Sequence, residues 1–252
     1  MVYLSGNGRE MTLETETEQP VPGSEKPNYS VPWRFIDNWI GVILLALIQG
    51  MIAIIILRGS KTELAQSAAI VLLELAYILP VILILIWRRV SWKSLGFGRF
   101  EWKTLGLGCG LLIGAYAIII VHNALLYFLG VDTQGAKIVK MFAELNSPFW
   151  FSIVAALVAP FVEETFFRGF LFQGFRTHYG WKTGMLLSSA IFAAAHLDLA
   201  ALIPTFILGN VLAYVFHRSN SIWPGIILHF LVNSFGVSAA YFATHYQNFI
   251  PL

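Results

Sequence analysis

Three charged residues stand in the middle of an apolar, aromatic stretch of the sequence. The segment SIVAALVAPFVEETFFRGFLFQGF holds Glu163, Glu164 and Arg168 within six residues. Ionisable side chains in such a stretch are costly to bury, so each one needs a partner and indicates a functional site. Glu164 and Arg168 are four residues apart, which puts them on one face of a helix where they can form an ion pair. Glu163 points about 100° away around the same helix and is left free to face another element.

Two later apolar segments each carry a histidine. The segment IFAAAHLD has Phe192 and His196 four residues apart, and ILHFLVN has His229 and Asn233 at the same spacing. Counting helical rise from the basic residues at the ends of these segments places Glu163, His196 and His229 at similar depths, roughly 16 to 21 Å from those ends. We therefore expect the carboxylate and the two imidazoles to meet at one level of a helix bundle.

A carboxylate facing imidazoles can activate a water molecule. Glu163, surrounded by phenylalanines, is suited to take a proton from water, and a histidine beside it can share that proton. His229 and Asn233 can donate hydrogen bonds to an oxygen that gains charge when water attacks a carbonyl carbon. A second mechanism stays open, because His196, His229 and Glu163 could instead hold a catalytic zinc ion. The helical zinc signature HExxH is absent, so no cofactor is assigned firmly.

The elements that must position these residues are apolar enough to lie in a membrane. Of the 252 residues, 57% are hydrophobic and 12% are charged, whereas roughly a quarter of the residues in soluble domains are charged. Several apolar segments approach or exceed the length of about 20 residues that crosses a bilayer. We predict an all-α, polytopic transmembrane helix bundle of about seven spans, with eight as the alternative count. The predicted segments are Trp39–Leu57, Leu64–Trp87, Leu105–Leu129, Phe149–Phe175, Thr183–Leu197, Ala200–Phe216 and Ile222–Thr244.

The distribution of basic residues predicts the orientation of these spans. The connection 88–104 is strongly basic and holds Arg88, Arg89, Lys93, Arg99 and Lys103 against Glu101 alone. By the positive-inside rule this short loop is cytoplasmic, which places the N-terminus in the cytoplasm too. Arg176, Lys182 and Arg218 fall on the same side in the seven-span scheme, whereas Lys137 and Lys140 fall outside and argue against it.

The rest of the sequence indicates how the chain is divided into domains and which classes of partner are not indicated. Residues 1–30 are polar and contain three prolines, so we expect a disordered tail. Residues 33–252 are expected to form one transmembrane domain, with the catalytic core at 149–244. The net charge of +2 does not indicate nucleic-acid binding. The single cysteine, Cys109, excludes an intramolecular disulfide framework.

Two features of the N-terminal spans indicate helix packing. Gly106, Gly110 and Gly114 recur every four residues in the third span, which predicts the close approach of another helix. Glu74 is a lone acidic residue in the second span, and we interpret it as a hydrogen-bonding partner of a neighbouring helix, with a position on the cavity lining as the alternative.

Taken together, the three motifs resemble those of the CPBP intramembrane protease family. This family is also called the CAAX-protease and bacteriocin-processing, or Abi, family, and it includes the Rce1-type prenyl-protein peptidases. Its pattern is an EExxxR segment, then FxxxH, then HxxxN or HxxxD, each on its own membrane helix. Here EETFFR, FAAAH and HFLVN match in that order. The resemblance covers residues 149–244, and the first three spans match only in being hydrophobic.

The resemblance implies roles for the motif residues. It implies that Glu163 activates water together with His196, and that His229 and Asn233 form the oxyanion site. The supporting residues that it implies are Glu164, Arg168 and Phe192. It further implies a polar cavity that opens toward the cytosol and the lipid. It does not decide whether zinc is required, because members have been described both as metalloproteases and as metal-free glutamate proteases.

The expected function is therefore that of an intramembrane endopeptidase. It would hydrolyse a peptide bond in a membrane-associated or lipidated, CAAX-type peptide or protein, in contact with membrane lipid and, in a bacterium, at the plasma membrane. A proton-coupled transporter is one alternative, since buried Glu, His and Arg also make proton relays. Against it, the charges cluster in the C-terminal half, with no matching interruption in the N-terminal half. A non-catalytic membrane scaffold or immunity protein is the other alternative.

Overall fold

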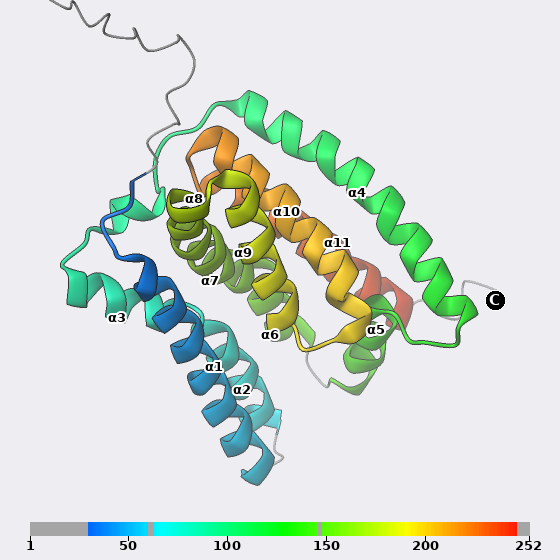
Figure 1. Cartoon of the computed structure of the whole chain (residues 1–252). Coiled ribbons are helices and arrows are strands. Elements are labelled where there is room, and N and C mark those ends of the chain that lie inside the picture. Colours follow the sequence, from blue (N-terminus) through cyan, green and yellow to red (C-terminus); the bar gives the residue numbers. More distant parts are fainter. Residues whose placement is uncertain (1–29, 60–62, 146–147, 246–252) are drawn as a thin grey trace, which may run out of the picture.

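All regular structure in the described part of the chain is helical. The structure is a computed structural model that describes residues 30–59, 63–145 and 148–245 (Figure 1). The tail predicted for residues 1–30 lies outside the described residues, except for its last residue. Six helical stretches are long and apolar enough to cross a membrane. The chain is thus a multi-pass membrane protein with an all-helical bundle, as predicted.

The first two spans pack against each other as an antiparallel pair. Helix α1 (Phe35–Arg58) is followed by α2 (Glu63–Leu75) and α3 (Ile78–Arg88). The second predicted segment is therefore two helices, because Pro80 has no N–H to donate to the carbonyl of Ala76 at the junction. Arg88, at the end of α3, donates from Nε and Nη2 to the two carboxylate oxygens of Asp37, at 2.8 and 2.6 Å. This bidentate pair fixes the start of α1 beside the end of α3.

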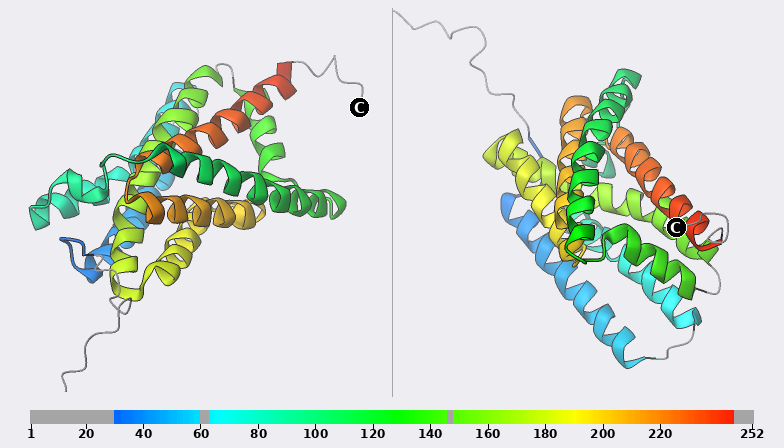
Figure 2. Two further views of the ribbon diagram at one scale, coloured as in Figure 1. Left: turned by 90° about the horizontal axis from the view of Figure 1, so that it is seen from above. Right: turned by 90° about the vertical axis from the view of Figure 1, so that its right-hand side faces the viewer.

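The third span and the helix after it complete the N-terminal half. A 3-10 turn, η1 (Trp92–Leu95), precedes α4 (Trp102–Phe128). The connection predicted for 130–148 contains an amphipathic helix, α5 (Gln134–Glu144), which the sequence analysis missed. The Thr133 hydroxyl caps α5 by accepting from the Ala136 N–H at 3.2 Å. Figure 2 shows α4 lying along α10, and α5 beside α11.

The fourth span is one long helix whose geometry changes four times. It consists of α6 (Pro148–Ile153), the π-helical segment η2 (Val154–Val158), α7 (Ala159–Glu164), a second π-helical segment η3 (Thr165–Phe172) and α8 (Gln173–Tyr179). Pro160 contributes to the first change, since it cannot donate to the carbonyl of Ala156. π-Helical turns inside α-helices occur frequently at functional sites. Here they flank Glu163 and Glu164.

The last helices pack around this interrupted helix. They are α9 (Trp181–Ala195), the short 3-10 turn η4 (Leu199–Ala201), α10 (Leu202–Ser219) and α11 (Trp223–His245). The fifth predicted segment corresponds to α9, which is not among the six candidate spans. Its 15 residues rise about 22 Å, less than the thickness of a hydrocarbon core. By length and composition the described residues therefore give six candidate spans rather than seven.

The prediction that another helix packs closely against Gly106, Gly110 and Gly114 of α4 is wrong. A Cβ added at Gly106, Gly110 or Gly114 would meet nothing within 4 Å, so none of the described helices approaches there. The close approach is at Gly108 instead, where a Cβ would lie 2.3 Å from a methyl carbon of Leu228 on α11. Spacing alone could not distinguish these faces, because Gly108 lies on a different side of α4 from the other three.

Several helix ends are joined into one end of the bundle. The Gln173 amide donates to the Ser94 carbonyl at 3.0 Å, and Arg176 donates to the Asn220 side chain at 2.9 Å. The Ile222 N–H donates to the Gly96 carbonyl at 2.9 Å. The end of α8, the turn between α10 and α11, and the loop around η1 therefore lie together. We call this the basic end; its basic residues are Arg34, Arg88, Arg89, Lys93, Arg99, Lys103, Arg176, Lys182 and Arg218.

Candidate active site

The predicted ion pair in the fourth span is present and fully buried. Nη1 of Arg168 lies 2.6 Å from Oε1 of Glu164, and the two side chains are 1% and 0% exposed. Nη2 of Arg168 donates to the carbonyl of Gly209 on α10 at 3.2 Å, and its guanidinium lies 4.4 Å from the ring centre of Phe192 on α9. The pair therefore neutralises two buried charges and also joins η3 to α9 and α10.

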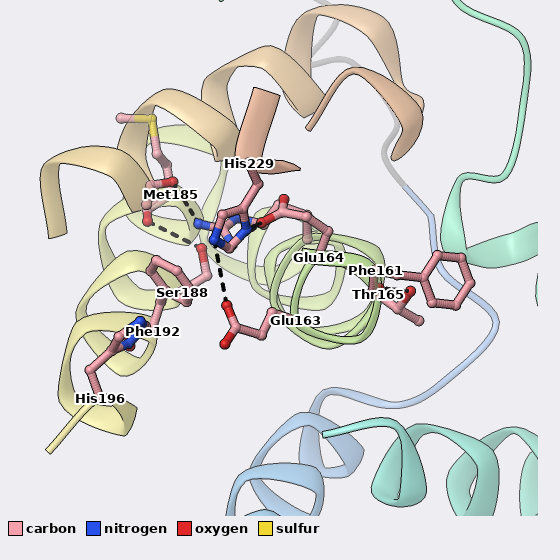
Figure 3. A network of polar contacts seen from close by, with 11 residues as sticks. Phe161, Glu163, Glu164, Thr165, Met185, Ser188, Phe192, His196 and His229 are labelled. Carbon is pink, nitrogen blue, oxygen red and sulfur yellow. Dashed lines mark hydrogen bonds and ion pairs between the residues drawn. The ribbon is translucent and has the colours of Figure 1, made fainter. Parts of the chain in front are cut away.

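His229 lies between the two glutamates. Its Nδ1 is 3.0 Å from Oε1 of Glu164, and its Nε2 is 3.7 Å from Oε2 of Glu163 (Figure 3). In its ion pair with Arg168, Oε1 of Glu164 accepts from the guanidinium. The same oxygen acts as the acceptor toward His229, so Nδ1 carries the proton in this hydrogen bond. Glu164 thus orients the imidazole, and Nε2 is left to face Glu163.

Glu163 lines a large cavity. The cavity has a volume of about 1030 Å³, and its lining includes Glu163, His196, His229 and Asn233. The Glu163 side chain is only 8% exposed and that of His229 only 3% exposed. A carboxylate in such a position can reach a water molecule in the cavity while most of its surroundings are protein. All four residues predicted as catalytic therefore border one space.

His196 and Asn233 also line this cavity, and each contacts a backbone carbonyl. His196 ends α9, and its Nδ1 lies 2.8 Å from the Phe192 carbonyl. The Phe192 ring stands between the two histidines, with its centre 4.8 Å from the His196 ring and 5.9 Å from the His229 ring. Asn233 lies one turn after His229 on α11 and donates from Nδ2 to the Ala155 carbonyl of η2 at 2.8 Å. The two residues thus contact backbone carbonyls, and no described hydrogen bond joins either one to Glu163.

The described residues do not form a zinc site in this arrangement. In the part of the chain that the structure describes, no three His, Cys, Asp or Glu side chains converge on a point that could hold a metal ion. Both ring nitrogens of His229 face carboxylates, and Nδ1 of His196 faces a backbone carbonyl. The ligand set that the sequence left open, His196, His229 and Glu163, therefore does not fit, and we derive no chemical step through a metal.

Glu74 lines the cavity, which was the alternative that the sequence analysis left open for it. It lines the same cavity from α2, where it is within electrostatic range of Glu163 and His229. Its Oε2 is buried and has no hydrogen-bond partner among the described residues, so this oxygen makes no helix-to-helix hydrogen bond there. A useful signal was Tyr77, a second polar residue three positions later and thus on the same face. Tyr77 also lines the cavity.

Comparison with known proteins gives one family and three relatives. Residues 145–235 match the profile of the family described as type II CAAX prenyl endopeptidase Rce1-like. A protein of Bacillus subtilis (strain 168) named "Putative membrane peptidase YdiL" is 26% identical over 162 residues, which cover 62% of this chain and 66% of that protein. An "Uncharacterized 24.3 kDa protein" of Escherichia coli is 29% identical over 138 residues, covering 52% of this chain and 64% of that protein.

The match to the third relative covers a shorter segment. "UPF0177 protein YxdF" of Lactococcus lactis subsp. lactis (strain IL1403) is 31% identical over 87 residues, covering 34% of this chain and 48% of that protein. The matches thus span between 48% and 66% of the lengths of these relatives. No solved structure matches the chain. The profile match contains all three motifs, so the family predicted from them is confirmed.

Proposed function

We propose that this chain, which belongs through residues 145–235 to the Rce1-like family, is a membrane-embedded endopeptidase. Its substrate would be a membrane-associated or lipidated peptide or protein of the CAAX type. The observation that carries the proposal is that the nearly buried Glu163 side chain lines the cavity, with Nε2 of His229 3.7 Å away. A general base needs this combination of access to water and a neighbouring group that exchanges protons.

In the proposed reaction Glu163 removes a proton from water while the water oxygen attacks the scissile carbonyl carbon. The carbonyl oxygen becomes an oxyanion, which His229 and Asn233 stabilise by donating hydrogen bonds. Nδ1 of His229 already donates to Glu164, so Nε2 must also carry a proton to donate to the oxyanion. Collapse of the tetrahedral intermediate breaks the C–N bond, and protonated Glu163 returns its proton to the leaving amine.

His196 has a supporting role in this proposal. It is half-buried on the cavity wall, and Nδ1 is engaged by the Phe192 carbonyl at 2.8 Å. A neutral imidazole that donates from Nδ1 leaves Nε2 free to accept. A water molecule held between Glu163 and His196 would therefore be polarised from two sides.

The proposed orientation places the basic end in the cytoplasm, as the positive-inside rule requires. It also requires α9 to cross as a short seventh span, because α9 leaves the basic end after Arg176 and α10 returns to it at Asn220. The lysines that argued against this scheme are paired: Lys137 with Asp198 and Lys140 with Asp132. Their contribution to the charge of the opposite end is thus offset.

Cleavage by the purified protein tests the function. The full chain in lipid nanodiscs would be incubated with a farnesylated CAAX-type peptide and with the same peptide lacking the farnesyl group, and products identified by mass spectrometry. We expect endoproteolytic products that a chelator does not abolish, from protein without stoichiometric zinc. Products that disappear with zinc removal would overturn the metal-free mechanism. Absence of cleavage of both peptides, and of a broader membrane-peptide set, would favour the scaffold or transporter alternatives.

A further inference from the structure

We propose that Glu74 is a substrate-binding residue of the catalytic cavity, whose carboxylate holds the nitrogen side of the bond that is cleaved. It would accept from the N–H of the scissile peptide group and, after cleavage, pair with the new amino group as an ammonium ion. None of the three motifs includes Glu74, and α2 lies outside the residues 145–235 that match the family. The identity of this ligand rests on the proposed peptidase function, whereas the position and charge of Glu74 are argued from the structure.

Glu74 borders the cavity from a helix of the N-terminal half. Helix α2 packs against α7, which carries Glu163, and α11, which carries His229 and Asn233, packs against α7 as well. Figure 1 shows α1 and α2 on one side of the interrupted helix and α11 on the other. Residues of both α2 and α11 line the cavity, and Glu74 is within electrostatic range of Glu163 and His229. A group bound in the cavity can therefore contact α2 and α11 at the same time.

The hydrogen-bonding capacity of Glu74 is not fully used within the protein. Its Oε2 is buried and has no hydrogen-bond partner among the described residues. The buried Asp37, by contrast, accepts from the Arg88 guanidinium at both of its carboxylate oxygens. A buried carboxylate oxygen without a donor is destabilising, so it indicates a role other than packing. Because the terminal torsion of a glutamate is broad, a rotation of the carboxylate can turn either oxygen toward a donor in the cavity.

The charges on the cavity lining favour a positively charged ligand. Among the described lining residues, the acidic side chains are Glu74 and Glu163, the histidines are His196 and His229, and there is no lysine or arginine. Two carboxylates within electrostatic range of each other repel when both are ionised, and a cation bound beside them removes that repulsion. Such an interaction is stronger in a partly buried site than in bulk water. An amino group is therefore a better ionic ligand for this cavity than a carboxylate.

The geometry of a peptide group directs its nitrogen toward the part of the lining that α2 contributes. The C=O and N–H of a planar, trans peptide group point in opposite directions. If the scissile carbonyl oxygen faces His229 and Asn233 on α11, the N–H is directed away from α11 and can donate to Glu74. Hydrolysis then gives a carboxylic acid and an amine, and the proton of the acid passes to the amine, which becomes an ammonium ion. Glu74 would thus bind first a neutral donor and then a cation, and the charge-assisted pair is the stronger one.

Binding of a peptide amine tests this role without requiring cleavage. The probe is a tripeptide of apolar residues with a free amino terminus and an amidated carboxyl terminus, compared with the same tripeptide acetylated at its amino terminus. Both would be titrated into the full chain in nanodiscs at pH 7, where a peptide amino group is mostly protonated, and dissociation constants measured by ligand-detected NMR. Glu74→Gln keeps the shape of the side chain and removes its charge. Glu144→Gln is the matched control, since it makes the same change at an exposed residue of α5 that is not among the cavity-lining residues.

We expect the wild type and Glu144→Gln to bind the free amine about 10-fold more tightly than the acetylated peptide, because a hydrogen bond to a charged group contributes about this factor to binding. Glu74→Gln should lose this preference and bind the acetylated peptide as the wild type does. The proposal is overturned if the wild type does not bind the free amine or binds both peptides equally. It is also overturned if Glu74→Gln keeps the preference, because another group, such as Glu163, would then hold the amine.

The binding test and the cleavage test can fail separately. A chain that shows the amine preference but cleaves no peptide would refute the peptidase proposal and leave the binding role of Glu74 in place. A chain that cleaves peptides but shows no amine preference would refute the role of Glu74 alone.

Discussion

The two halves of the interrupted helix 148–179 differ in the burial of their side chains and in the pairing of their charged residues. On the side of the basic end, residues 166–175 are all buried, and the charge of Arg168 is neutralised by Glu164 at 2.6 Å. On the other side, Glu163 borders a cavity of about 1030 Å³, and the imidazole Nε2 of His229 lies 3.7 Å from its carboxylate oxygen. The difference lies between two consecutive residues. It separates a glutamate that serves stability from one that is available for chemistry.

The comparison also shows how the closed half supports the open half. Glu164 belongs to the closed half by its pairing with Arg168, yet the same carboxylate oxygen accepts from His229, which faces Glu163. Because Arg168 also donates to the Gly209 carbonyl, the position of His229 depends on three helices. The closed half thus sets the orientation of a group in the open half.

The largest effect on stability is expected from Glu164→Ala. It would leave Arg168 as an unpaired charge among buried phenylalanines, and breaking a buried pair in this way costs about 3–5 kcal/mol. Thermal unfolding in nanodiscs measures the loss, with Glu163→Gln as the matched control that should change stability far less. If Glu164→Ala instead unfolds at the wild-type temperature, the Gly209 carbonyl alone stabilises the buried charge of Arg168. Glu164 would then contribute no more to stability than Glu163, which contradicts the account.

A comparable loss, but in catalysis, is expected from Asn233→Ala. If Asn233 donates to the oxyanion, kcat should fall about 100-fold to 1,000-fold while KM changes little, because the interaction exists mainly in the transition state. Asn210→Ala is the control, since Asn210 likewise donates to a backbone carbonyl, that of Phe206 at 2.7 Å, but does not line the cavity. Equal losses of kcat in both variants, measured per folded molecule, would remove Asn233 from the oxyanion site.

Two glycine substitutions compare the packing of the closed half of helix 148–179 with that of the cavity lining. In Gly174→Ala the new Cβ would lie 2.0 Å from Nδ2 of Asn38, whose Oδ1 accepts from the Trp33 indole at 2.9 Å. Overpacking of this kind costs about 1–3 kcal/mol. Gly236→Ala, on the cavity wall, meets nothing within 4 Å and should be neutral or slightly stabilising. Chemical denaturation of both variants checks the contrast, and equal stabilities would contradict it.

The smallest effect is expected at the rim. Lys137→Ala removes the ion pair with Asp198, whose side chains are 47% and 19% exposed. Such pairs contribute about 0–1 kcal/mol, less at high salt. Cleavage by this variant should stay close to that of the wild type. A several-fold loss of activity at unchanged stability would instead show that α5 holds the turn that follows His196.

Spacing predicted the local contacts of the site well. The four-residue interval between Glu164 and Arg168 fixed their pairing before any fold was known, because helical geometry allows few alternatives. The depth argument placed Glu163, His196 and His229 at a similar level, and all three border one cavity. Their catalytic roles remain predictions.

Contacts between distant helices could not be predicted from spacing. The two-sided position of His229 depends on how α11 rotates against α7, which no local pattern encodes. The same limit explains the wrong choice of glycines on α4, where Gly108 and not the four-residue series meets α11. The amphipathic helix α5 was missed because its charged residues were weighed only as topology signals.

The central claim is that Glu163 is the base that activates water. Its most direct test is the rate of peptide cleavage by Glu163→Gln compared with the wild type, both purified in nanodiscs and assayed with a peptide that the wild type cleaves. The amide keeps the shape of the side chain but cannot accept the proton, so we predict a fall in kcat of about 100-fold to 10,000-fold with unchanged thermal stability. Cleavage by Glu163→Gln at close to the wild-type rate would contradict the assignment.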